Sequence, residues 1–136
     1  MISKEIQNTR LIYARSVKKS WVLLFRSLFI IATLFVIYES LVPSNSATVP
    51  GRFDKIMHFA AYFTLVYFAA LAYPKARLLH IVGAMILLGA ALEGTQGFMS
   101  VGRTASFGDF LANLLGACTA AISWIGCIKM LLSRYR

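Results

Sequence analysis

Four long apolar segments are the feature that most limits how this chain can fold. They cover residues 21–42, 56–73, 78–98 and 107–132, and polar or proline-containing stretches separate them. Each has about the 20 residues that a helix needs to cross a hydrocarbon core of ~30 Å. Inside lipid every backbone N–H and C=O group must find a partner within the protein, and separate apolar runs achieve this as helices. The sequence therefore predicts an all-α bundle of four transmembrane helices.

The composition favours a membrane protein over a soluble one. Hydrophobic residues make up 59% of the 136-residue chain and charged residues 14%, whereas soluble domains carry about 25% charged residues. We therefore divide the chain into a basic segment, residues 1–20, and a four-helix membrane domain, residues 21–132. The basic segment is expected to be either a cytoplasmic tail or a helix on the membrane surface. The first apolar run exceeds the ~7–15 residues of a signal-peptide core, so we expect it to be retained.

The net charge of +9 is distributed unevenly about the four segments. Of the 14 Lys and Arg residues, only Arg52, Lys55 and Arg103 fall on the side opposite the two termini. Because short loops rich in Lys and Arg stay in the cytoplasm, we predict that both termini are cytoplasmic. The basic excess thus indicates a topology and contact with anionic lipid, and we expect no nucleic-acid partner.

Small residues recur every four positions in the last two apolar segments. One pair is Ala90 and Gly94, and a longer series is Ala112, Gly116 and Ala120. Small side chains at this spacing let helices approach closely in lipid. We expect both sets to serve packing within the chain rather than dimerisation.

Polar residues gather at the predicted outer ends of the apolar segments. Residues 54, 58 and 62 are four apart, as are 109 and 113, and such residues share one helical face. With both termini on one side of the membrane, all of these faces fall at one depth. The set consists of Glu39, Asp54, Lys55, His58, Tyr62, Glu93, Gln96, Arg103, Asp109 and Asn113.

The chemistry of this set suggests a site, because ionisable groups inside a membrane cost about 2.5–3.5 kcal/mol each and are commonly functional. Asp54, His58 and Glu93 are the candidate catalytic residues, as acid or base. Asp, His and Glu could also bind a divalent metal, but we assign no metal and no cofactor. Cations and helix N-termini at this level suit an anionic group. The candidate ligand-binding residues are Lys55, Tyr62, Gln96, Arg103, Asp109 and Asn113.

A structural interpretation stands beside each assignment. Ser106 and Asp109 have the spacing of a capping box, so Asp109 could simply begin a helix. Asp54 could likewise stabilise a helix N-terminus. Glu93 could pair with a basic residue such as Arg103 and only fix the helix arrangement. Caps and ion pairs do not, however, account for the histidine, glutamine and asparagine of the set.

Two motifs resemble those of a known family. DKIMHFAAYFTL, residues 54–65, resembles the DKxxHFxxY opening of the VanZ-like family. EGTQGFMSVGRTASFGDFLANLLG, residues 93–116, resembles its second signature, ExxQ followed by an arginine and SxxDxxxNxxG. The motifs occur in the expected order and the resemblance covers about half of the chain. The motif residues are Asp54, Lys55, His58, Phe59, Tyr62, Glu93, Gln96, Arg103, Ser106, Asp109, Asn113 and Gly116.

The resemblance implies a small multi-pass protein of the bacterial cytoplasmic (inner) membrane. The founding member of that family is associated with low-level resistance to the glycopeptide antibiotic teicoplanin. We expect the chain to bind an anionic amphiphile at its extracytoplasmic face, either a lipid-linked cell-wall or polysaccharide intermediate or a glycopeptide or lipopeptide antibiotic. Two alternatives stay open. One is a membrane enzyme acting on a lipid-linked envelope substrate, and the other is a structural or assembly partner whose polar cluster only fixes helix packing.

Overall fold

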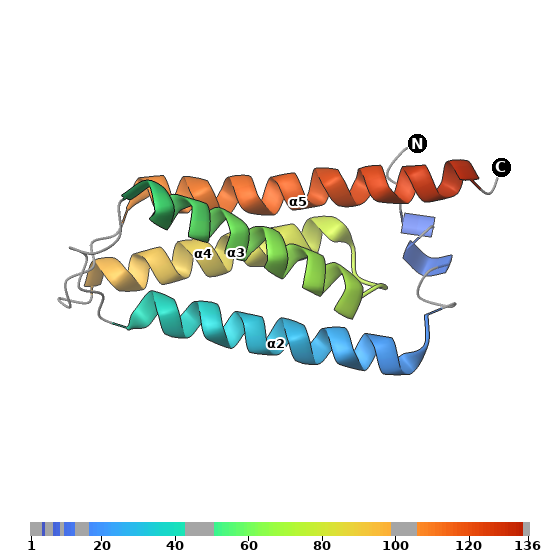
Figure 1. Cartoon of the computed structure of the whole chain (residues 1–136), viewed down its shortest axis with the longest axis horizontal. Coiled ribbons are helices and arrows are strands. Elements are labelled where there is room, and N and C mark those ends of the chain that lie inside the picture. Colours follow the sequence, from blue (N-terminus) through green and yellow to red (C-terminus); the bar gives the residue numbers. More distant parts are fainter. Residues whose placement is uncertain are drawn as a thin grey trace.

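The computed structural model is a bundle of four long helices (Figure 1). The structure describes residues 4, 7–8, 10–12, 17–42, 51–98 and 106–134, with only the backbone described for residues 51–52, 129 and 131–134. Each long helix is long and apolar enough to cross a membrane, which confirms the predicted four-helix membrane bundle. The helices are α2 (Lys19–Leu41), α3 (Gly51–Ala72), α4 (Leu78–Phe98) and α5 (Phe107–Arg134).

Three helices extend beyond the apolar runs, and α2 does so by beginning at Lys19, two residues before residue 21. Helix α3 begins at Gly51, five residues before the predicted start at residue 56, and α5 continues to Arg134. Hydropathy marks only the part of a helix that faces lipid, whereas backbone hydrogen bonding continues into polar sequence. Asp54 lies in the first turn of α3, where a negative charge stabilises the helix N-terminus. The extension places Asp54 and Lys55 on a helix rather than in a loop.

Helices α3 and α4 form the middle of the bundle. Each contacts the other three long helices, whereas α2 and α5 lie on opposite sides of them (Figure 1). The side chains of Leu65 and Val66 on α3 and of Ala117 on α5 are fully buried. Large apolar side chains such as Leu34 and Leu79 are exposed on the outside. An apolar exterior around a packed interior suits a bundle surrounded by lipid.

The small-residue series on α5 forms the closest helix contact. A Cβ atom added to Gly116 would overlap the main-chain carbonyl of Phe59 on α3. Ala112 and Ala120, one turn to either side, are also buried. The pair on α4 differs, since a Cβ on Gly94 would meet no described atom within 4 Å. The expected packing role thus fits the α5 series, while the α4 pair faces outward.

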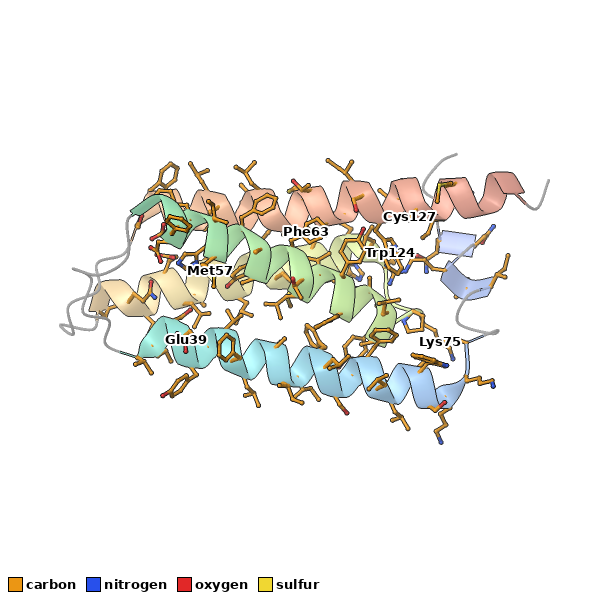
Figure 2. The ribbon with its side chains drawn as sticks, in the orientation of Figure 1. Glu39, Met57, Phe63, Lys75, Trp124 and Cys127 are labelled. Carbon is orange, nitrogen blue, oxygen red and sulfur yellow. The ribbon has the colours of Figure 1, made fainter. Side chains whose placement is uncertain are left out.

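The two ends of the bundle carry different side chains. We call the end where α3 and α5 begin the polar end, defined by residues 54–58, 93–96 and 106–113. The opposite end, the basic end, is defined by Arg10, Lys18, Lys19, Arg26, Lys75 and Arg77. Glu39 and Lys75 mark the two ends in Figure 2. Which end faces the cytoplasm stays a prediction from the charge distribution.

Two arginines cap the C-terminus of α3 at the basic end. Arg10 Nη2 donates to the carbonyl oxygens of Ala70 and Tyr73, both at 3.2 Å. Arg26 Nε donates to Ala72 O at 3.2 Å, with its guanidinium 5.3 Å from the centroid of the Tyr73 ring. Cations are favourable where helical carbonyls lack partners. Burial lowers the pKa of the Arg10 guanidinium from its ordinary value, and this residue joins the basic segment to the bundle.

Candidate functional site

An ion pair joins the first turns of α3 and α5. Lys55 Nζ lies 3.4 Å from Asp109 Oδ1, and the Asp109 side chain is only 11% exposed against 50% for Lys55. The lysine stem passes so close to Gly108 that an added Cβ would lie 2.8 Å from Lys55 Cε. Glycine at this position therefore makes room for the lysine. The two residues belong to different motifs in the sequence and meet only because the helices begin at one level.

The ring of His58 lies between an amide and a carboxylate. His58 Nδ1 is 3.1 Å from Asn113 Oδ1 on α5, and Asn113 is 3% exposed. Since an amide oxygen only accepts, Nδ1 carries the hydrogen in this arrangement. The other ring nitrogen, Nε2, is 3.9 Å from Asp54 Oδ1. This distance is too long for a hydrogen bond, so Nε2 faces a carboxylate without being bound by it.

Glu93 connects the end of α4 to the start of α5. Its Oε2 accepts a hydrogen bond of 3.1 Å from Ser106 N, while Ser106 Oγ accepts one of 3.3 Å from Asp109 N. In a capping box the acid three positions after the cap would accept the Ser106 N–H. Here Glu93 accepts it, and the Asp109 carboxylate is directed to Lys55 instead. Asp109 is therefore more than a helix cap.

Gln96 has a role in packing. Its Nε2 donates to Ser40 O at 2.7 Å, and both residues are buried. Ser40 is next to the last residue of α2, where carbonyl oxygens have no partner within the helix. The amide of Gln96 thus caps a neighbouring helix. Glu39, which was expected at this level, is exposed, and its neighbour Ser40 makes the contact through its main chain.

Tyr62 is the most deeply buried side chain of the predicted set. It is 1% exposed, and its Oη has no hydrogen-bond partner in the part of the chain that the structure describes. A Cβ added to Gly89 of α4 would lie 3.2 Å from both Tyr62 Oη and Asn113 Nδ2. Gly89 therefore lets the phenol and the amide approach α4, one turn deeper than His58.

Three of these groups are close enough to share a metal ion. Ligand atoms of Asp54, His58 and Asp109 all lie within 4.8 Å of one another. Imidazole and carboxylate ligands suit zinc, manganese or iron. The ammonium of Lys55 already compensates the charge of Asp109. The same groups can therefore serve as metal ligands or as a proton-transfer network.

The described charges at the polar end are mainly negative. Asp54, Glu93 and Asp109 contribute three carboxylates, and Lys55 contributes the one described lysine ammonium. Glu93 interacts electrostatically with both aspartates and with His58. Arg103, predicted to bind an anion, lies outside the described residues. Among the side chains that the structure describes, the site is therefore better suited to proton transfer than to holding an anion by itself.

Sequence reasoning missed three contributors to this cluster, and one of them is Gly108, which makes room for the lysine stem. Ser40 acts through its carbonyl oxygen, which no side-chain pattern reports. Gly89 acts by having no side chain, and only its four-residue spacing from Glu93 hints at a shared face. The other predicted residues that the structure describes are brought to one end of the bundle.

Fold and site together define a multi-pass membrane protein with a partly buried cluster of ionisable and polar side chains at one end of its bundle. A family model described as VanZ/LLP1 matches residues 3–131, which is nearly the whole chain. The chain therefore belongs to the VanZ/LLP1 family, as the two sequence motifs indicated. Searches of curated proteins and of solved structures found no match.

Proposed function

We propose that this protein is a membrane enzyme that acts on the polar head of a lipid-linked cell-envelope substrate at the polar end. The observation that carries the proposal is the position of His58. Asn113 orients the ring through Nδ1, while Nε2 lies 3.9 Å from Asp54 Oδ1 and remains free to exchange a proton. A histidine oriented in this way beside a carboxylate is typical of general acid–base catalysis.

The surrounding groups support a phosphoester as the reacting group. The N-termini of α3 and α5 lie at this end, and helix N-termini favour phosphate. His58 Nε2 would take the proton of an attacking hydroxyl or water as the new P–O bond forms. The P–O bond to the leaving group breaks, and the imidazolium returns the proton to the leaving oxygen. Arg103 would compensate the phosphate charge, because Lys55 is paired with Asp109, in keeping with the anionic amphiphile expected from the sequence.

The charge balance favours turnover over simple binding. Lys55 is paired with Asp109, and the described acids outnumber the described cations at this end. A site built only to hold an anion would not need three carboxylates around a histidine. With the basic end in the cytoplasm, the polar end would face outer-leaflet intermediates of wall or polysaccharide synthesis. Altering such an intermediate would also change the target of a glycopeptide such as teicoplanin.

A packing role is the second candidate, and specific contacts favour it for two residues. Gln96 binds Ser40 O, and Glu93 binds Ser106 N, so both join helix ends whether or not a substrate is present. Neither contact involves His58. The two functions can therefore be separated residue by residue.

The experiment is to reconstitute the protein in vesicles made from a bacterial envelope lipid extract that contains undecaprenyl-linked intermediates. Head groups would be followed by phosphorus NMR and mass spectrometry. Wild-type protein should convert one lipid class, and His58→Gln should lower the rate by about 10²–10⁴-fold. The matched control is His80→Gln, which changes the other histidine, exposed near the start of α4, and should keep full activity.

Equal lipid profiles for wild type and His58→Gln, with both proteins folded, would contradict the enzyme proposal. Loss of thermal stability in Gln96→Leu without loss of conversion would assign that residue to packing alone.

A further inference from the structure

A second candidate site lies at the basic end, far along the bundle from His58. A cavity of about 880 Å³ opens between the first turns of α4 and the middle of α5, beside the N-terminal residues Lys4 and Gln7. Its volume falls within the ~300–1,000 Å³ that small-molecule sites usually have. None of the polar-end residues lines it, so it is separate from the proposed catalytic cluster.

The lining of this cavity combines charged and apolar side chains. Lys4 and Arg77 supply two cations to the lining, and Arg77 immediately precedes α4. Most of the other lining residues are apolar, among them Leu78 and Val82 from α4 and Ile122 and Ile125 from α5. No acidic side chain lines the cavity in the described part of the chain.

The start of α4 adds to the positive character of the rim. His80 N and Ile81 N both donate to Arg77 O, which makes Arg77 the residue from which the helix starts. The N–H groups of the residues just after it, Leu78 and Leu79, have no partner within an α-helix. Unpaired N–H groups and a positive helix end favour a phosphate, and both belong to residues that line the cavity.

From these observations we infer that the basic-end cavity binds one anionic glycerophospholipid, with its phosphate at Lys4 and Arg77 and an acyl chain along the apolar walls. Charge complementarity identifies the occupant, since a leaflet facing the basic end would contain anionic lipid and each basic residue near it adds affinity. The bound lipid would join the basic N-terminal segment to α4 and α5, and it is a stable component rather than the substrate of the polar end.

The test is a lipid titration of the purified full chain in neutral detergent, read by native mass spectrometry. Phosphatidylglycerol is compared with zwitterionic phosphatidylcholine. Wild-type protein should retain one phosphatidylglycerol in preference to phosphatidylcholine. The double variant Lys4→Gln/Arg77→Gln should bind phosphatidylglycerol roughly 20-fold more weakly, at about fivefold for each basic residue. Lys18→Gln/Lys75→Gln, which removes two exposed charges of the same end outside the cavity, should bind like wild type.

A second variant tests the apolar part without removing charge. Ile122 is 71% exposed at the cavity, so Ile122→Trp can fill it without disturbing the core. This change should lower binding of phosphatidylglycerol. Phosphatidylglycerol binding that is unchanged in both the charge and the tryptophan variants would overturn the inference, as would equal affinity for the two lipids. A lipid-free dimer disrupted by Ile122→Trp would identify a second copy as the occupant and would also overturn it.

The two cysteines give a readout that needs no substitution. Cys118 lines the cavity, whereas Cys127 is exposed and does not line it. Phosphatidylglycerol should slow alkylation of Cys118 and leave that of Cys127 unchanged, and equal rates at Cys118 with and without lipid would contradict the site. His58→Gln should retain the lipid, so failure of the enzyme proposal and failure of this inference are distinguishable.

Discussion

The polar end and the basic end of this bundle both place charged side chains at a membrane boundary. The groups to which these side chains bond differ between the two ends. At the basic end the guanidinium groups of Arg10 and Arg26 donate to main-chain carbonyls of α3. At the polar end Glu93 and Gln96 also bind the main chain, but two further pairs join side chains of different helices, Lys55 with Asp109 and His58 with Asn113. A carbonyl cap requires only a donor, whereas the polar-end pairs require particular side chains. This difference distinguishes a structural boundary from a candidate site.

The largest expected effect concerns the contact that aligns α3 with α5. Gly116→Ala should lower the free energy of unfolding by about 3 kcal/mol, because the new methyl group overlaps the Phe59 carbonyl and the helices must separate. Thermal unfolding in detergent would measure the loss. The polar-end pairs depend on this alignment, so catalytic activity should fall as well.

Gly126→Ala is the matched control on the same helix at the basic end. A Cβ there meets nothing described within 4 Å, so stability should change by less than about 0.5 kcal/mol. Equal losses for the two variants would mean that the contact between Gly116 and α3 does not determine the effect.

The second prediction compares two side-chain bonds between α3 and α5. His58 bonds to Asn113 near the polar end, and the hydroxyl groups of Tyr67 and Ser123 bond nearer the basic end. Tyr67 also contacts the rings of Phe63 and Trp124, which Figure 2 places between the two helices. Asn113→Leu leaves a buried ring nitrogen without its acceptor and should cost about 1–3 kcal/mol.

Loss of each of these two bonds should also have a different effect on turnover. Asn113→Leu should also lower turnover about 100-fold, because the His58 ring loses its orientation. Ser123→Ala should cost about 1 kcal/mol and leave turnover unchanged. Thermal unfolding and the vesicle assay on both variants would check this. Loss of turnover in Ser123→Ala would show that turnover depends on the overall stability of the bundle and not specifically on the bond between His58 and Asn113.

The outline of the fold follows from the sequence because lipid permits so few alternatives. Apolar length identified four spans, and topology then required the polar ends of α3, α4 and α5 to meet. Helix α3 begins before the predicted apolar run, because Asp54 and Lys55 lower the local hydropathy although they continue the helix. Charged residues beyond a span are common helix formers, but hydropathy cannot report them.

The sequence indicated which residues lie together at the site. It did not indicate which of these side chains contact one another. Four-residue spacing placed Asp54, His58 and Tyr62 on one face. Which partner each side chain meets depends on the rotation of every helix, and that depends on contacts such as Gly116 against Phe59. Glu93 accepts a hydrogen bond from a main-chain N–H, and no side-chain pattern encodes that choice of donor. The expected anion site also depended on Arg103, which lies outside the described residues.

The smallest expected effect compares a helix cap at each end. Gln96 caps the end of α2 with a neutral amide at 2.7 Å, and Arg26 caps the end of α3 with a charged guanidinium at 3.2 Å. Gln96→Leu should cost about 1–2 kcal/mol, since it leaves the buried Ser40 carbonyl unpaired. Arg26→Leu should cost only about 0.5 kcal/mol, because the arginine is exposed and its charge is hydrated.

The dependence on salt concentration should distinguish the two caps more clearly than the sizes of the two stability losses do. At 1 M salt the Debye length shrinks to about 3 Å, which weakens the attraction between Arg26 and the negative end of α3. The difference in unfolding temperature between wild type and Arg26→Leu should therefore shrink as salt rises, while that of Gln96→Leu stays constant. A salt-dependent loss in Gln96→Leu would mean that its contact with Ser40 influences the charged pairs beside it. Gln96 would then belong to the proposed catalytic cluster and not to the packing of α2.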